Sequence, residues 1–240
     1  MFSMKRISAL LVASLPGLAL GAEINFVQQV GEGGAAVVVI LGLSILFLAV
    51  TLERLRHLRV RAVMPPDLVA RVQPLWAAHR YDELQRLLAE DGSILARVIA
   101  CMVEHRSQKY EVVSRLAGDL ASMELRQHQQ KAYALAIVAT VAPIVGLLGT
   151  VLGMVEAFHV IAFSEGMGNP ALLAGGISKA LVNTAAGLIV ALPALGMHHY
   201  FKHRLATFGL ALEKQINGLI NLHFLPPPET PALRVVQHAH

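Results

Sequence analysis

The chain has 240 residues, of which 55% are hydrophobic and only 15% are charged, and its mean hydropathy is +0.56. This composition is too apolar for an ordinary soluble domain and predicts an all-α integral membrane protein with several spans. The net charge of +4 arises from 20 Lys and Arg against 16 Asp and Glu, and most charges of both signs lie together between 53 and 131. This mixture indicates a solvated surface and excludes a basic nucleic-acid groove.

The first 22 residues have the layout of a cleavable signal peptide. Lys5 and Arg6 precede an apolar segment over 7–20, and small residues follow at Gly21 and Ala22. An uncleaved signal anchor is the alternative, but the segment is short for a span and contains Pro16. Cleavage leaves residues 23–33 as a periplasmic N-terminus.

A first transmembrane helix is predicted over 34–52, where the chain carries no charge. Arg54, Arg56, Arg59 and Arg61 follow it, whereas no Lys or Arg lies between 23 and 34. Because cytoplasmic flanks are rich in Lys and Arg, the first span runs from the periplasm to the cytoplasm.

Residues 53–131 predict a helical cytoplasmic domain. Asp67 is placed to cap a helix after Pro65 and Pro66, Gly92 to end a helix, and Ser93 to cap the next one.

A further helix is predicted from an apolar face that recurs at helical spacing. This helix continues through Lys131 into the second span, so it forms a rod from the cytoplasm into the membrane. The face consists of Val112, Leu116, Leu120 and Met123.

Two further apolar runs predict transmembrane helices over 132–156 and 172–197, joined by a periplasmic loop over 157–171. Lys179 is the single charge within the third span. Lys202 and Arg204 follow that span, so 198–240 is predicted to be a cytoplasmic C-terminal helix with a disordered tail. The mature chain therefore has three spans, a periplasmic N-terminus and a cytoplasmic C-terminus.

Small residues recur at helical spacing in both runs. Such ridges allow helix backbones to approach closely in a bilayer, where packing drives helix association. The sequence predicts a helix-packing role for Gly146, Gly149, Gly153 and Gly187.

Two segments, APIVGLLGTVLGM from Ala142 and GISKALVNTAAGLIVALPAL from Gly176, resemble the MotA/TolQ/ExbB proton-channel family, in particular its ExbB and TolQ branch. The resemblance implies an inner-membrane pentamer that surrounds the helices of a single-span partner of the ExbD or TolR type. It also implies that Thr150 and Thr184 face the pore. The chain departs from the family at Lys179, where a glutamate is usual, and at Asn183, where an alanine is usual.

Five polar residues of the spans are candidates for the pore or proton pathway, although each has a simpler interpretation. A threonine or serine hydroxyl often bonds a carbonyl of its own helix, without any functional role. A lysine at a helix centre costs about 2.5–3.5 kcal/mol on insertion scales, so it requires an acidic partner or must snorkel to the interface. The candidates are Thr150, Thr184, Asn183, Lys179 and Ser178.

Proton transfer requires a group that titrates, and hydroxyls do not titrate at neutral pH. No Asp or Glu lies between the charged residues that bound each apolar run, so the working carboxylate, and the acid that answers Lys179, should come from another polypeptide. The resemblance supplies an aspartate in the ExbD or TolR helix.

The resemblance implies a proton-channel subunit that converts proton motive force into mechanical work for TonB-dependent outer-membrane transport. A TolQ-like role in the Tol-Pal envelope system and a non-conducting membrane scaffold are the alternatives. A TonB- or TolA-type energy transducer is a further expected partner. No catalytic motif, cofactor loop or complete metal-ligand set is present in the sequence, so the chain is not expected to be an enzyme or to hold a cofactor.

Overall fold

The computed structural model describes residues 34–163 and 170–224. Within these ranges the chain is helical and has no strand, which confirms the all-α prediction. The predicted signal peptide over 1–22, the stretch over 23–33 and the tail beyond 224 lie outside the described residues. The helices are α3 (Gly34–His57), α4 (Val60–Val63), α5 (Leu68–Ala77), α6 (Tyr81–Asp91), α7 (Ile94–Glu104), α8 (Tyr110–Phe163) and α9 (Pro170–Phe224).

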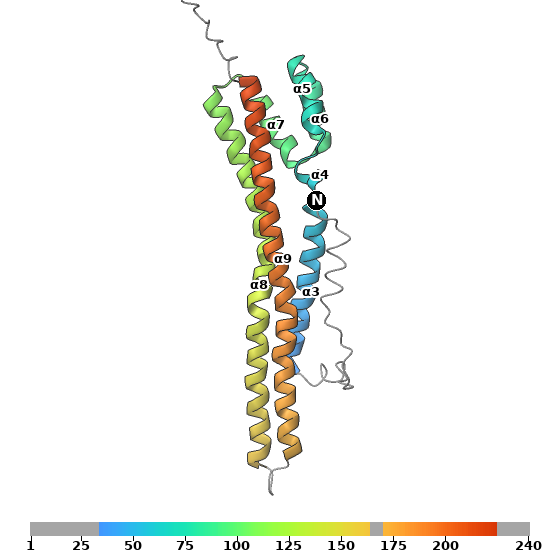
Figure 1. Cartoon of the computed structure of the whole chain (residues 1–240), viewed down its shortest axis with the longest axis vertical. Coiled ribbons are helices and arrows are strands. Elements are labelled where there is room, and N and C mark those ends of the chain that lie inside the picture. Colours follow the sequence, from blue (N-terminus) through green and yellow to red (C-terminus); the bar gives the residue numbers. More distant parts are fainter. Residues whose placement is uncertain (1–33, 164–169, 225–240) are drawn as a thin grey trace, which may run out of the picture.

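Two very long helices, α8 and α9, lie side by side in opposite directions along the whole molecule (Figure 1). The 54 residues of α8 extend about 80 Å at 1.5 Å per residue, far more than a ~30 Å hydrocarbon core requires. This helix confirms that the second span continues into a long helix outside the membrane. Helix α9 is likewise unbroken through Pro193, so the predicted third span and the predicted C-terminal helix are one element.

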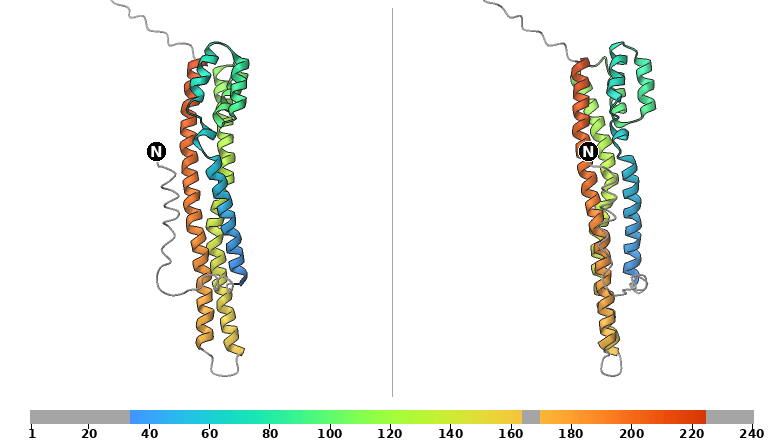
Figure 2. Two further views of the ribbon diagram at one scale, coloured as in Figure 1. Left: turned by 90° about the vertical axis from the view of Figure 1, so that its right-hand side faces the viewer. Right: turned by 45° about the vertical axis from the view of Figure 1, so that its right-hand side comes forward.

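Helix α3 packs lengthwise against α8 and α9, which extend beyond it at both ends (Figure 2). These three helices are long and apolar enough to cross a membrane. The segment predicted as the loop 157–171 is helical as far as Phe163 and again from Pro170. No Gly or Pro interrupts 157–163, so nothing in that stretch ends α8 at the predicted position.

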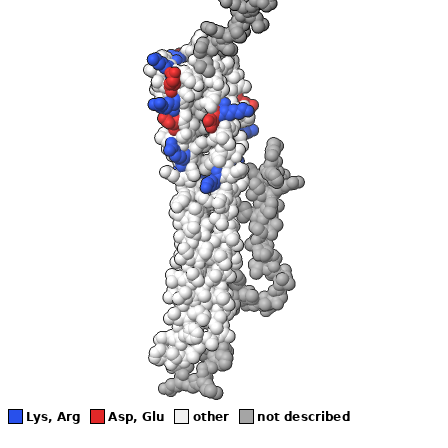
Figure 3. Space-filling model, turned by 60° about the vertical axis from the view of Figure 1, so that its left-hand side comes forward, with Lys and Arg blue, Asp and Glu red and all other residues white. Residues whose placement is uncertain are grey.

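Charged side chains gather at the end of the bundle that holds α4–α7, whereas the other half of the face in Figure 3 carries none. Within the charged end, α7 supplies much of the hydrophobic core, with Leu95, Ile99 and Met102 fully buried. Gly92 ends α6 at φ 61°, and the Ser93 hydroxyl accepts a hydrogen bond from the Ala96 backbone amide. Both of these end signals are confirmed.

One sequence prediction for the charged end is wrong and another holds only in part. Asp67 lies at the start of α5 but makes no capping bond, because its backbone is already helical at φ −94° and ψ −6°. On α8 the fully buried residues are Val113, Ala117 and Ala121; of the predicted face, Leu116 and Leu120 are half-buried, whereas Val112 and Met123 are 42% and 50% exposed, so that prediction holds only in part. Small residues let neighbouring helices approach, so packing selected the alanine face over the larger apolar side chains.

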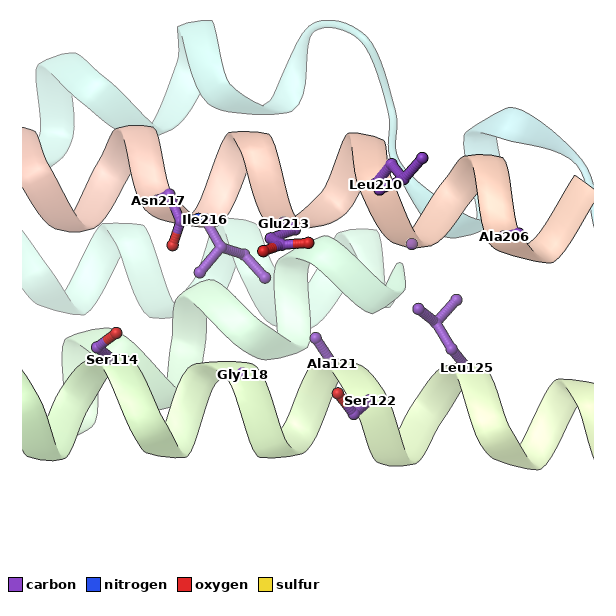
Figure 4. A pocket seen from close by; sticks show the side chains of 11 residues that line it. Ser114, Gly118, Ala121, Ser122, Leu125, Ala206, Leu210, Glu213, Ile216 and Asn217 are labelled. Carbon is purple, nitrogen blue, oxygen red and sulfur yellow. The ribbon is translucent and has the colours of Figure 1, made fainter.

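The charged halves of α8 and α9 leave an open groove of about 660 Å³ between them, and Leu125, Leu210 and Ile216 are among the residues that line it (Figure 4). Glu213 is the single charged residue that lines it. At the far end of α9, the His223 ring stacks on the Trp76 indole of α5 at 4.5 Å. This contact ties the small helices to the end of the long hairpin.

Candidate functional site

Glycines bring α8 and α9 into backbone contact in the middle of their apolar runs. A Cβ atom added at Gly187 would lie 2.6 Å from the Ala142 carbonyl oxygen, and one at Gly146 would lie 2.8 Å from the Asn183 carbonyl oxygen. Such distances do not occur between a real Cβ atom and a backbone oxygen, so only glycine fits at both positions. Farther along the hairpin, Gly153 packs on Ala180. The antiparallel register of the two helices is set by these contacts.

Gly149 serves a three-helix contact. A Cβ atom added there would lie 2.8 Å from the Ala36 Cβ of α3 and 2.9 Å from the Asn183 side chain of α9. The structure thus places the four glycines singled out in the sequence at helix contacts within one chain. Helix α3 already fills the open side of Gly149, so this glycine packs within its own chain.

The close approach brings the two candidate threonines together. The Thr150 and Thr184 hydroxyls contact each other directly across the α8–α9 interface. The Thr150 hydroxyl also lies 3.1 Å from the Gly146 carbonyl oxygen and 3.2 Å from that of Ala180. One hydroxyl therefore donates to the other, and the remaining hydrogen goes to a carbonyl. The pair forms a half-buried polar cluster in an otherwise apolar interface.

Asn183 and Ser178 lie elsewhere. The Asn183 side chain is 2% exposed and packs between α3, α8 and α9, where its Oδ1 atom has no hydrogen-bond partner among the described residues. Ser178 is exposed on α9. The polar pair is therefore formed by Thr150 and Thr184, with Asn183 behind it on the side that faces α3.

Lys179 has an acidic neighbour in its own chain. Its Nζ atom lies 3.7 Å from an Oε atom of Glu156, and the two side chains are 31% and 69% exposed. This corrects the expectation that only another polypeptide can answer Lys179. Glu156 is the last residue of the predicted second span, and the hairpin register returns Lys179 to the same level. Counting from the connection between the two helices would have revealed the pairing.

Sequence reasoning missed a charged cluster where α3 meets α8. Arg54 near the end of α3 is only 1% exposed, donates to the Glu53 carboxylate and approaches His128 of α8, with 3.5 Å between Nη1 and Nδ1. Because an arginine only donates, this contact forms when His128 is neutral and accepts through Nδ1. Burial lowers the pKa of His128, and the nearby Arg54 and Lys131 cations lower it further. The sequence pattern gave no sign that Arg54 is buried, since Arg54 belongs to the same run of arginines as its exposed neighbours.

We expect the folded chain to lose stability as the pH falls below the ordinary histidine pKa. The unfolded chain takes up a proton at His128 near pH ~6.5, whereas the lowered pKa makes the folded chain resist it. Thermal unfolding at pH about 7.5 and about 5.5, either side of that value, measures the loss. His128→Gln keeps an acceptor that cannot ionise and should reduce the pH dependence. His203→Gln, on an exposed part of α9, should leave it unchanged; equal effects of both variants would contradict the prediction.

Comparison with known proteins shows which family the helices of this site resemble. Residues 88–214 match the model of the MotA/TolQ/ExbB proton channel family. The chain is 33% identical to biopolymer transport protein exbB1 of Vibrio cholerae over 113 residues, which are 47% of this chain and 50% of the relative. It is 29% identical to the ExbB-like 3 protein of a Synechocystis species over 195 residues, 79% of this chain and 90% of that protein.

A third relative, the ExbB protein of Aquifex aeolicus, is 42% identical over 71 residues, covering 30% of this chain and 47% of the relative. The chain spans about half the length of the first curated relatives it matches, such as the 50% of the Vibrio protein. The family match covers α7 and α8 and most of α9, and so includes both threonines and the Lys179–Glu156 pair. With three apolar helices of spanning length, the chain is a multi-pass membrane protein, and it belongs to the MotA/TolQ/ExbB proton channel family.

Proposed function

We propose that this chain is an inner-membrane proton-channel subunit that works with a single-span partner of the ExbD or TolR type. The complex converts proton motive force into mechanical work for TonB-dependent outer-membrane transport. The chain assembles as a pentamer around the partner, with its N-terminus periplasmic and its C-terminus cytoplasmic. Membership of the proton channel family supports the proposal, as does the Arg-rich end of α3, which indicates the cytoplasmic side.

The observation that carries the proposal is the hydroxyl pair of Thr150 and Thr184. It provides hydrogen-bonding oxygens where the two helices are otherwise apolar. The hydroxyls cannot store a proton at neutral pH, so a carboxylate on the partner is required to load and release it. In this arrangement the threonine pair hydrogen-bonds the partner carboxylate or a water molecule bound to that carboxylate. These hydrogen bonds stabilise the carboxylate while the proton passes through the apolar core.

Proton flux into proteoliposomes tests the role of the threonines. We expect flux only when the chain is reconstituted with the single-span partner encoded beside it. Thr184→Val should reduce this flux about fivefold, because a neutral hydrogen bond contributes about 1 kcal/mol. Thr140→Val is the matched control, since the Thr140 hydroxyl bonds only carbonyls of its own helix and is exposed. Undiminished flux in Thr184→Val would rule out the assigned role.

A non-conducting scaffold is the second candidate, and one observation favours it. Both threonine hydroxyls already have acceptors within the chain, so neither needs a proton pathway to be satisfied. A scaffold predicts normal assembly with the partner and no proton flux at any pH. A TolQ-like role predicts flux with a TolR-type partner in place of an ExbD-type one, and co-purification of the native complex distinguishes the two partners.

A further inference from the structure

A second, smaller groove lies between α8 and α9 where their apolar runs give way to charged residues. It has a volume of about 180 Å³, several times the ~30 Å³ that a water molecule occupies in the liquid. Among the described residues it is lined by α8 and α9, through Gln129, Ala132, Tyr133, His198, Lys202 and Leu205.

The polar side chains of this groove are all able to donate hydrogen bonds. Gln129 and Tyr133 are four residues apart on α8, and His198 and Lys202 are four residues apart on α9, so each pair projects from one helix face. An amide, a phenol, an imidazole and an ammonium group thus line one space, with no carboxylate among the lining residues. The Lys202 charge, the three other donors and the lack of a carboxylate together favour an anion.

Two of these four polar groups have no partner among the described residues. The His198 Nδ1 atom is buried and has no hydrogen-bond partner among the described residues. Lys202 is exposed, and no ion pair within the described ranges includes it. The floor is closed by Ala132 and Leu205, which are 4% and 6% exposed. A ligand enters from the open side and meets the donors above an apolar base.

The level of the groove relative to the membrane indicates which anion it meets. On α9 the residues between Lys179 and Lys202 carry no charge, and on α8 the residues between Lys131 and Glu156 carry none. Lys202 and Lys131 thus each stand at the end of an uncharged run. Tyr133 is 61% exposed, and tyrosines are enriched at the level of the lipid headgroups. Basic pockets between transmembrane helices at this level bind anionic headgroups.

We propose that this groove binds the phosphate of an anionic membrane phospholipid. The Lys202 ammonium forms a charge-assisted pair with the phosphate, and the Gln129, Tyr133 and His198 donors hold its remaining oxygens. The acyl chains run along the exposed apolar surface of α8 that begins with Ile137 and Ile144, which are 46% and 64% exposed. The lipid thereby bridges α8 and α9 at the membrane boundary.

Lipid retention by the full chain in detergent tests the site. Native mass measurement with added phosphatidylglycerol or phosphatidylcholine should show preferential retention of phosphatidylglycerol. Lys202→Gln should weaken that retention about fivefold, the contribution of one lysine near an anionic surface. Lys214→Gln removes the same charge from an exposed position of α9 that does not line the groove, and it should change nothing. Unchanged thermal unfolding of both variants confirms that they are folded.

Several results would overturn the proposal. Equal retention of the two lipids would exclude an anion site, and equal losses in Lys202→Gln and Lys214→Gln would reduce the effect to general surface charge. Soluble glycerol phosphate supplies the same phosphate without acyl chains. If it displaces phosphatidylglycerol at millimolar concentration, the groove is a free-phosphate site and the lipid assignment fails. If a second copy of the chain covers the groove, no lipid can bind there. Any phosphatidylglycerol that is still retained would then bind elsewhere, and Lys202→Gln would not change its amount.

Discussion

Gly187→Leu is expected to separate α8 from α9 and to destabilise the chain by about 3 kcal/mol or more, the upper range for overpacking a tight contact. At this position even a Cβ atom would lie 2.6 Å from the Ala142 carbonyl oxygen and 3.2 Å from the Gly146 Cα. Both neighbours are backbone atoms, so neither can rotate away as a side chain would. Chemical unfolding in mild detergent measures the loss, and cross-linking between α8 and α9 reports whether the helices have moved apart.

Gly196→Leu provides the control on the same helix, because a Cβ atom there has no neighbour within 4 Å. It carries the same change in helix propensity without the collision. If the two variants unfold alike, close backbone contact does not hold this hairpin together. Gly149→Leu should behave like Gly187→Leu, since its neighbours are Ala36 and Asn183 of the same chain. Any loss of oligomer in Gly149→Leu would then follow from damage to the fold.

Lys179→Glu is expected to abolish most proton-driven activity while leaving the chain folded. The change places two carboxylates side by side, because Glu156 lies 3.7 Å from the Lys179 ammonium. Glu156 is 69% exposed and Lys179 is half-buried at 31%, and pairs open to solvent contribute only about 0.2–1 kcal/mol to stability, so little unfolding should result. Activity responds more strongly if a partner carboxylate lies near Lys179. A neighbouring cation lowers a carboxyl pKa by about 1–3 units, and each pKa unit lost with the cation changes the proton occupancy of the carboxylate about tenfold.

The exchanged double variant Glu156→Lys with Lys179→Glu separates three explanations. If the pair within the chain positions the ends of α8 and α9, the exchange restores the pair and with it the activity. If Lys179 instead faces a carboxylate of the partner, the exchange cannot restore activity, and Lys179→Met should resemble Lys179→Glu. If Lys179 only snorkels to the membrane surface, every variant should retain wild-type uptake in a proton-dependent assay, and no role in proton transfer remains.

Much of the architecture could be predicted from local sequence because it depends on local quantities. A run of uncharged residues of spanning length can satisfy its backbone groups in a membrane only as a helix or a closed barrel, and helix is the form that one segment can adopt by itself. The Gly92 and Ser93 signals act over one turn, so they predicted the end of α6 and the start of α7. The continuity of α8 from Tyr110 to Lys131 followed from the absence of proline in that stretch, and Pro143 within the apolar run does not end the helix.

The tertiary structure decided what depends on the register between distant segments. Thr150 and Thr184 are 34 residues apart, and the hydroxyls meet only because Gly146 and Gly187 allow the backbones to touch. The same register pairs Lys179 with Glu156, although each looked unpaired in its own helix. Periodicity ranks the apolar faces of α8 by hydrophobicity, whereas close packing selects the face of Val113, Ala117 and Ala121 by shape. Arg54 is buried for a related reason: the placement of α8 beside the end of α3 is a property of the assembled helices and of neither sequence alone.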